Sequence, residues 1–318
     1  MYKPHFTKNF IQPHCEMWLI YKQIILVFFK NNQFNMEKIN IKFEDNIAET
    51  LLIPLWMRAQ ESKRSDALLH DEISEKLVEF IDYDFEKFSV DKKSQVGVAL
   101  RTRYLDKIVK DFIESHEHPV ILMGGCGLDP RMSRIQTSHS YMCYDLDLQE
   151  VIEYRKVLIP EVQNEQCISG SLFDTGWMTD LKDRHPNGNF LFIVEGVLMY
   201  FEEEVVRKFV NDLSEHFPGS ELYIERVGTL MSKNTKHHSS VNKTKAEFVW
   251  GCNDPQTVLS WNPSIKLISQ YYFMKDAPIR TGFLGMLAKL LALYIHLLQF
   301  LLIIFQRLQI FFHQMNIH

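Results

Sequence analysis

Residues 120–127, with the sequence VILMGGCG, decide the fold, because an unbroken apolar run passes directly into a glycine-rich turn. Four consecutive apolar residues are typical of a strand that is buried on both faces, as in a parallel sheet. The glycines that follow allow the backbone to turn sharply and to approach a ligand without an intervening Cβ. The stretch therefore predicts a buried strand whose carboxyl end lies at a binding site.

Further apolar runs of strand length follow, and helix-like segments alternate with them. The strand-like runs are residues 140–144, 167–169, 190–194, 221–225 and 266–273, and the amphipathic segments are residues 149–158 and 202–217. This alternation predicts βαβ units and a parallel sheet, whereas residues 45–115 read as mainly helical. We expect an α/β fold with a doubly wound, mostly parallel sheet and a helical N-terminal cover. In such a sheet, ligands bind beyond the carboxyl ends of the strands, where the strand order reverses.

The composition is that of a folded protein and lacks the excess of positive charge that is typical of nucleic-acid binding. The 318 residues are 46% hydrophobic and 24% charged, with 35 Lys+Arg against 40 Asp+Glu and a formal charge of −5. This balance lacks the clustered positive charge that nucleic-acid binding needs. The five cysteines are scattered and never form a CxxC pair, which argues against a disulfide framework and a zinc site and favours a reducing cytosol.

The two ends of the chain are richer in apolar residues than the middle. Residues 18–29 are nearly all apolar, but no small-x-small cleavage site follows, so we interpret residues 1–35 as an extension outside the fold. Residues 290–305 are apolar except for His296 and Gln299. They predict a hydrophobic helix over residues 283–318 that packs on the core or on a second copy, lies in a membrane surface, or spans a membrane. Residues 36–115 would form the helical cover, and residues 116–282 the core.

Two acidic residues end the second predicted strand. Asp145 and Asp147 lie about 20 residues after the glycine loop, the separation at which an acid meets a ribose diol. A carboxylate can accept hydrogen bonds from two adjacent hydroxyls at once. We interpret Asp147 as the ribose partner and Asp145 as a capping or outward-facing residue. The loop alone is weak evidence, because a dinucleotide fingerprint needs a third glycine where Pro130 stands.

Residues beside the other strands complete the predicted site. After the third strand, Leu172 or Phe173 could pack on an adenine face while Asp174 or a backbone group reads its amino edge; the alternative is an ordinary loop.

Glu195 follows five apolar residues and would be costly to bury without a partner, so we expect it to face the cleft. Upstream, Arg101 and Arg103 place two guanidinium groups beside the entrance of the sheet, and Arg suits a forked contact with a carboxylate, such as the amino-acid end of a cofactor. The alternative is a salt bridge of Arg103 with Asp106, or near Lys107, on a helix surface.

Five strings, taken in order, resemble the leucine carboxyl methyltransferase family, and within it the bacterial branch of O-methyltransferases of polyketide biosynthesis. The strings are residues 101–106 (RTRYLD), 125–131 (GCGLDPR), 144–152 (YDLDLQEVI), 194–200 (VEGVLMY) and 246–251 (AEFVWG). The resemblance extends from about residue 47 to about residue 276. It implies a class I, Rossmann-like methyltransferase fold with a seven-stranded sheet, and S-adenosyl-L-methionine as the cofactor.

The resemblance also implies roles for the matched residues. Arg101 would hold the methionine carboxylate, and Glu195 would lie by the methionine amine. Asp147 would bind the ribose. Gly125, with Gly127 after it, would be the glycine that the cofactor approaches closely.

The adenine end departs most from the family pattern. Ser171 and Leu172 would line the adenine, but the family usually has a polar or acidic residue in place of Ser171. It also usually has Thr where this chain has Pro130. The tail from residue 284 looks unlike the family's usual basic ending, and residues 1–35 have no counterpart in the resemblance.

The implied activity is methyl transfer to a hydroxyl or carboxylate oxygen of a small-molecule acceptor. This displacement needs alignment and the exclusion of water, and it needs a base only when the acceptor is a hydroxyl. No convincing base emerges: Tyr200 is a candidate, and His237 and His238 are more typical of a solvated loop. A NAD-dependent oxidoreductase and a non-catalytic binding module on a degenerate methyltransferase fold stay open. We expect a cytoplasmic protein, with membrane-surface association or self-association through the C-terminal helix as further expectations.

Overall fold

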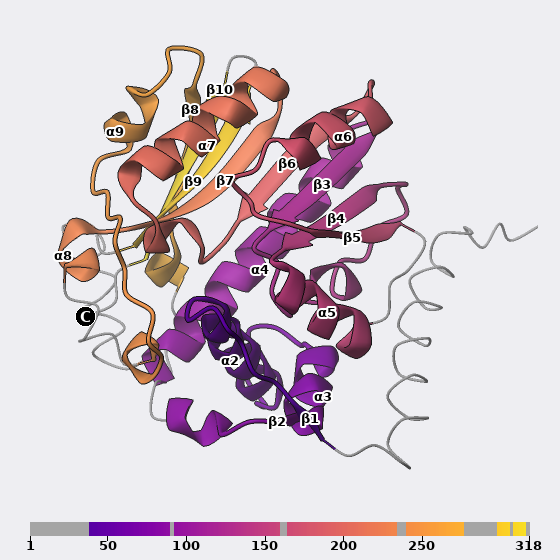
Figure 1. Ribbon diagram of the computed structural model, residues 1–318, viewed down its shortest axis with the longest axis vertical. Coiled ribbons are helices and arrows are strands. Elements are labelled where there is room, and N and C mark those ends of the chain that lie inside the picture. The colour runs from indigo at the N-terminus through magenta and orange to yellow at the C-terminus, as the bar shows by residue number, and fades with distance from the viewer. Residues whose placement is uncertain are drawn as a thin grey trace, which may run out of the picture.

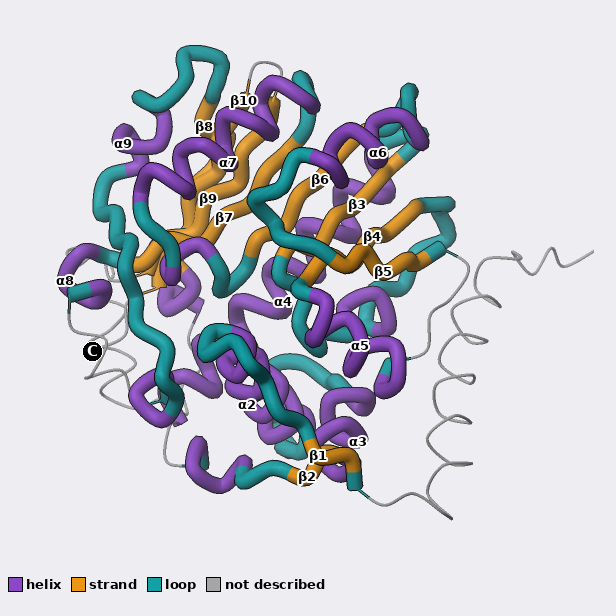
Figure 2. The backbone as a smooth tube through the Cα atoms, viewed as in Figure 1, coloured by secondary structure: helices purple, strands orange, loops and turns teal. Residues whose placement is uncertain are grey.

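Five adjacent parallel strands form the centre of the computed structural model, which describes residues 38–89, 92–159, 164–233, 240–276, 298–305 and 308–315 (Figures 1 and 2). In spatial order the strands are β5 (Glu165–Ser169), β4 (Met142–Asp147), β3 (Pro119–Gly124), β6 (Asn189–Val194) and β7 (Glu221–Val227). The order reverses at β3, because β4 and β5 lie on one side of it and β6 and β7 on the other. The predicted doubly wound, mostly parallel sheet is confirmed, and its switch point lies where the glycine loop begins.

Helices cover both faces of this sheet, and the side-chain alternation of β3 explains why. Ile121 belongs to an apolar cluster with α4 (Lys92–Ser115) and α5 (Gln149–Leu158). Its neighbour Leu122 belongs to a second cluster with α6 (Gly176–Arg184) and α7 (Glu203–His216). Successive side chains of a strand point to opposite faces, so alternate residues of an unbroken apolar run pack into the two apolar clusters on either side of the sheet.

The N-terminal cover is mainly helical, as the sequence predicts. It consists of α2 (Leu52–Ser62), α3 (Glu72–Phe80) and the first part of α4, which pack on one another. A two-residue parallel pair of β1 (Ile39–Asn40) and β2 (Ile81–Asp82) is an addition that the sequence does not indicate. The short elements are η1 (Ala48–Leu51), η2 (Phe85–Phe88), η3 (Arg131–Ser133), η4 (Leu198–Tyr200), α8 (Thr229–Ser232), η6 (Val241–Lys243), α9 (Pro255–Leu259) and η7 (Phe273–Asp276).

The helix predicted over residues 283–318 is wrong for residues 298–305 and 308–315. There β9 (Leu298–Phe305) and β10 (Leu308–Met315) form an antiparallel pair that joins the sheet with β8 (Lys266–Tyr272) beyond β7. The main sheet therefore has eight described strands rather than seven. Apolar runs of this length do not by themselves distinguish a buried strand from a buried helix.

The predictions for residues 1–35 and for residues 283–297 lie outside the described residues. Among the helices of the described ranges, none is long and apolar enough to cross a membrane. The expected membrane-surface and self-association roles of a C-terminal helix therefore have no support from the described strands β9 and β10.

A buried ion pair joins β4, α5 and the glycine loop. Asp145 is 4% exposed, and its Oδ2 lies 2.7 Å from Nη2 of Arg155. Arg155 also donates to the backbone oxygens of Gly127 (3.2 Å) and Asp129 (3.0 Å). The interpretation of Asp145 as a capping or outward-facing residue is therefore wrong. The carboxylate can be buried because a guanidinium compensates its charge.

We expect Arg155→Met to lower the free energy of unfolding by about 3–5 kcal/mol, because it leaves the Asp145 carboxylate buried without a compensating charge. Arg184→Met is the control, since it removes an exposed ion pair with Asp180 within α6 and should leave the stability nearly unchanged. Urea unfolding followed by circular dichroism measures both variants. Equal effects of the two substitutions would contradict the role given to Arg155.

Candidate functional site

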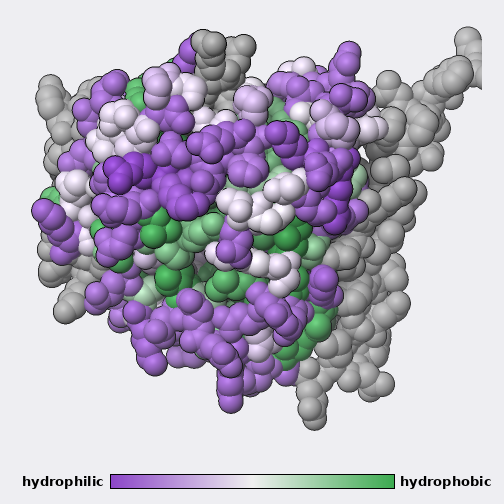
Figure 3. All heavy atoms as spheres, turned by 45° about the horizontal axis from the view of Figure 1, so that its top comes forward, coloured by the Kyte–Doolittle hydropathy of each residue, from purple (hydrophilic) through white to green (hydrophobic). Residues whose placement is uncertain are grey.

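A cavity of about 300 Å³ lies beyond the carboxyl ends of the parallel strands, where their order reverses. The space-filling view shows apolar surface gathered in a hollowed band between two polar zones (Figure 3). The lining comes from the glycine loop, the ends of β4 and β6, Glu225 within β7, α4, the start of α5, the loop after β5, the segments 45–58 and 195–201, and residues 241 and 248. The predicted cofactor residues that line it are Arg101, Gly125, Gly127, Asp147, Ser171, Leu172 and Glu195.

The glycine loop has a backbone conformation that requires its glycines. Gly125 has a φ of 68° and Gly127 a φ of 52°, a region that residues with a Cβ rarely adopt. A Cβ on Gly125 would lie 2.3 Å from Cγ2 of Val197, which leaves no room for it. The N–H groups of Gly125 and Cys126 donate to the backbone oxygen of Leu146, at 2.8 and 3.2 Å. The loop is therefore fixed against the end of β4.

The short η3, rather than a full helix, follows the glycine loop. The side chains beside Pro130 are held by buried ion pairs instead. Arg131 Nη2 lies 2.8 Å from Asp129, and Arg134 contacts both Asp129 (2.9 Å) and Asp106 (2.8 Å). Burial would raise the pKa of Asp129, but the surrounding guanidinium groups outweigh it and hold that pKa well below its usual range.

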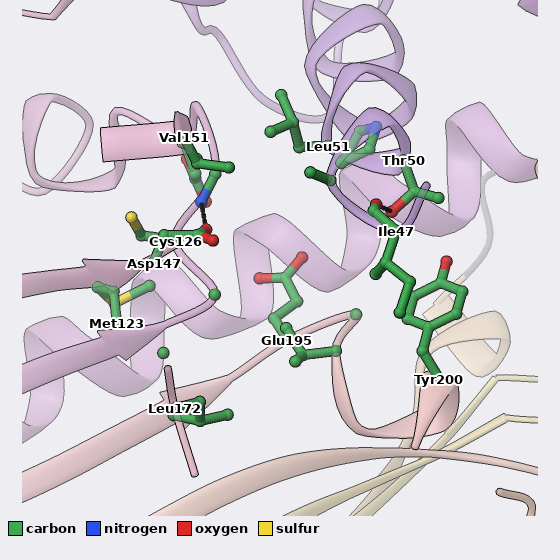
Figure 4. Close-up of a pocket in the computed structure, with 18 of the residues that line it drawn as sticks. Ile47, Thr50, Leu51, Met123, Cys126, Asp147, Val151, Leu172, Glu195 and Tyr200 are labelled. Carbon is green, nitrogen blue, oxygen red and sulfur yellow. Dashed lines mark hydrogen bonds between the residues drawn. The ribbon is translucent and has the colours of Figure 1, made fainter. Parts of the chain in front are cut away.

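Asp147 supports the glycine loop from the end of the neighbouring strand. Its Oδ2 accepts a hydrogen bond from the Gly127 N–H and its Oδ1 one from the Leu148 N–H, both at 2.8 Å. Figure 4 shows the carboxylate beside Cys126 and Val151 at one end of the cavity. Burial raises its pKa, and the two backbone hydrogen bonds oppose that shift. Each carboxylate oxygen has two acceptor positions, so Asp147 can hold the loop and still accept from a ligand.

Alternating charges cross the middle of the cavity. Arg101 of α4 contacts Glu195 at the end of β6, and its Nη1 lies 3.0 and 3.2 Å from the two carboxylate oxygens of Glu225. Behind them, Arg131 Nη2 lies 2.5 Å from Glu195, and the Gly196 N–H donates to Glu225 at 2.8 Å. Glu195 thus lines the cavity, as the sequence predicts, with the partners that its burial requires.

The pKa shifts in this row follow from burial and neighbouring charge. Burial would lower the pKa of Arg101, but Glu195 and Glu225 outweigh it and raise the pKa. Burial raises the pKa of Glu225 to about 7, although Arg101 opposes this shift. Arg101 therefore contacts both carboxylates, Arg131 also contacts Glu195, and Glu225 is partly protonated near neutral pH.

The loop after β5 supplies apolar lining but not the predicted acid. Ser171, Leu172 and Phe173 line the cavity, and the Phe173 ring packs on Phe201 with ring centroids 4.5 Å apart. Asp174 is exposed and does not line the cavity, because the loop turns there and its N–H donates to the Ser171 backbone oxygen. The prediction that Asp174 reads an adenine edge is therefore not supported by its position.

The opposite end of the cavity is formed by aromatic residues and a hydroxyl. Tyr200 and Thr50 lie there, across Glu195 from Asp147 (Figure 4). The Tyr200 ring packs on Phe248, with centroids 5.4 Å apart. Burial raises the pKa of Tyr200 to about 12, so its hydroxyl is protonated at neutral pH. The candidates His237 and His238 lie outside the described residues.

Two parts of the site are not predicted from the sequence. Glu225 lies within a strand rather than after it, and its charge directly after the apolar residues 222–224 could have indicated a buried partner. The segment 45–51 contributes Asp45, Ile47, Ala48, Thr50 and Leu51 to the cavity. Its contact with the glycine loop depends on the tertiary fold, and no local pattern predicts it.

Comparison with known proteins places these features in a family. A model of the leucine carboxyl methyltransferase family matches residues 52–214, just over half of the chain. The tetracenomycin polyketide synthesis O-methyltransferase TcmP of Streptomyces glaucescens is 28% identical over 232 residues, 73% of this chain and 84% of the relative. The S-adenosyl-L-methionine-dependent methyltransferase dpfgK of Gibberella zeae is 25% identical over 259 residues, 76% of this chain and 86% of the relative.

Solved structures with a similar arrangement are more distant in sequence. A DUF574 family protein from Streptomyces avermitilis has a TM-score of 0.48 and 9% identity, covering 70% of this chain and 87% of that one. The stretch matched by the family model contains the glycine loop, Asp147 and Glu195. The resemblance drawn from the sequence strings is thereby confirmed. The chain belongs to the leucine carboxyl methyltransferase family.

Proposed function

We propose that this chain transfers a methyl group from S-adenosyl-L-methionine to an oxygen atom of a small-molecule acceptor. Membership of a methyltransferase family supports methyl transfer, and relatives named as S-adenosyl-L-methionine-dependent or as O-methyltransferases support the donor and the acceptor atom. The observation that carries the proposal is one cavity that extends from Asp147 and the glycine loop, past Arg101 and Glu195, to Tyr200.

Each chemical group of S-adenosyl-L-methionine has a suitable counterpart among the residues that line the cavity. Arg101 and Glu195 line the same cavity with opposite charges, which suits the carboxylate and the ammonium of an amino-acid end. Asp147 has acceptor capacity for ribose hydroxyls, and Leu172 offers apolar surface to a purine. When bound, the cofactor supplies a methyl group that is already activated on a sulfonium.

The charge of the lining also fits a cationic donor. Five carboxylates and two guanidinium groups line the cavity, and Arg131 and Arg134, which do not line it, also contact Glu195 and Asp129. The lining carboxylates are Asp45, Asp129, Asp147, Glu195 and Glu225, and the arginines are Arg58 and Arg101. Of these, Asp45 and Asp147 form no salt bridge with a described arginine or lysine, so negative charge at their positions favours a bound cation such as a sulfonium.

The far end would bind the acceptor and exclude water. Tyr200, Phe248 and Thr50 surround this end, and the Tyr200 hydroxyl would donate a hydrogen bond that orients the acceptor oxygen. The high pKa of Tyr200 makes it a donor rather than a general base at neutral pH. A NAD-dependent oxidoreductase is less consistent with the loop, where Pro130 occupies the position of the third glycine.

We expect Asp147→Ala to weaken S-adenosyl-L-methionine binding by roughly 10-fold or more, because charged hydrogen bonds to the ribose are lost and the loop loses its support. Isothermal titration calorimetry measures the dissociation constant. Asp174→Ala is the control, since Asp174 is exposed and outside the cavity, and it should bind like the unchanged protein. Binding of NAD in place of S-adenosyl-L-methionine by the unchanged protein would contradict the proposed function.

We expect release of S-adenosylhomocysteine with at least one class of oxygen acceptor when phenols, hydroxy acids and carboxylic acids are screened. The pH profile identifies the acceptor group. The rate should rise with pH toward the pKa of a hydroxyl acceptor. For a carboxylate that is already ionised, it should be flat above about pH 8, where Glu225, with a pKa of about 7, no longer titrates. If S-adenosyl-L-methionine binds but no class yields product, the chain is a binding module rather than an enzyme.

A further inference from the structure

Residues 42–51, here called the strap, cross the cavity opposite the strand ends. We propose that Glu150 of α5 is the positioning residue that holds the strap over the cofactor and thereby sets how long the cofactor stays bound. This inference rests on the proposed function for the identity of the cofactor. Glu150 lies in one of the sequence strings that resemble the family, but neither the chemistry nor the cavity lining assigns it a role.

The strap forms a wall of the cavity directly against the glycine loop. In Figure 4, Ile47, Thr50 and Leu51 lie on the side away from Leu172. Cβ of Leu51 lies 3.1 Å from the position that a Cβ on Gly127 would occupy. A nucleoside beside Asp147 would therefore lie between the strap and the strand ends, and it could not leave past the strap unless the strap moved.

Glu150 holds the strap through its backbone. The carboxylate accepts from the Glu44 N–H at 2.8 Å and from the Asp45 N–H at 3.2 Å. Asp45 in turn accepts from the N–H groups of Ile47 (2.6 Å) and Ala48 (3.1 Å), where η1 begins. Two charge-assisted contacts thus fix the turn from which the cavity-lining part of the strap continues.

Contacts on either side of this turn limit the strap's freedom. Tyr154 lies one helical turn after Glu150, and its hydroxyl bonds to the backbone of Lys42, at 3.1 Å from N and 3.2 Å from O. At the other end, Glu49 accepts from the Tyr83 hydroxyl at 2.6 Å. Loss of the Glu150 contacts would therefore free the turn between two held ends, without removing the strap.

The same helix offers a matched control. Glu153 has the same charge and lies in the same helix, but its side chain contacts Gln149 at 2.8 Å and not the strap. Glu150→Gln is the conservative variant, because it removes the charge but keeps an oxygen that can accept from a strap N–H. Comparison of Glu150→Ala, Glu150→Gln and Glu153→Ala distinguishes the effect of losing the contact with the strap from the effect of losing a negative charge on α5.

The test measures release of S-adenosylhomocysteine from the full chain by stopped-flow fluorescence. We expect Glu150→Ala to raise the dissociation rate roughly 10-fold, Glu150→Gln to fall between that and the unchanged protein, and Glu153→Ala to stay within about twofold. Hydrogen exchange gives a readout that general destabilisation would not reproduce. The amides of Glu44 and Asp45 should exchange faster in Glu150→Ala, while those of the central strands stay unchanged.

Equal release from Glu150→Ala and Glu153→Ala would overturn the inference, and so would equal release from Glu150→Ala and Glu150→Gln. Faster exchange throughout the Glu150→Ala protein would also overturn it, because the residue would then stabilise the whole fold. If the unchanged protein binds no S-adenosylhomocysteine, the proposed function falls and the inference falls with it. Binding by the unchanged protein without a difference between variants overturns the inference alone.

Discussion

The hydrogen bond from the Gly127 N–H to the Asp147 carboxylate, 2.8 Å long, is the contact on which the rest of the site depends. It joins the loop that ends β3 to the end of β4, at the side of the sheet where the strand order reverses. Arg155 holds the backbone oxygen of the same glycine from behind. Because both backbone groups of Gly127 are bonded, the loop has one defined shape, and the cavity wall that it forms is rigid before any ligand arrives.

Buried charge is the second constraint, and it connects the helical cover to the sheet. Arg101 from the cover meets Glu195 and Glu225 from the sheet, and Arg131 meets Glu195 from the loop region. Each of these groups would be costly to bury alone, so the cover and the sheet depend on one another for compensation. The same charges lie where a zwitterion would bind, so a structural network also supplies the polar groups of the proposed cofactor site.

The sequence predicted what depends on short stretches of chain. The apolar runs at residues 120–123 and 190–194 predict strands, because a strand that is buried on both faces needs an unbroken apolar sequence. The sequence does not predict correctly those residues whose contacts come from distant parts of the chain. Asp145 was interpreted as outward-facing because its partner Arg155 cannot be recognised without the packing of α5 on β4. The segment 283–318, predicted as one helix, contains β9 and β10, since apolarity alone does not select between a helix and a strand.

In the proposed site, a cofactor nucleoside lies beyond the strand ends and Asp147 holds its ribose. A crystal structure of the chain with S-adenosylhomocysteine would show whether it does. We expect the ribose hydroxyls within hydrogen-bond distance of Asp147, the adenine against Leu172 and the amino-acid end between Arg101 and Glu195. Density for the ligand elsewhere, or a ribose that makes no contact with Asp147, would contradict it.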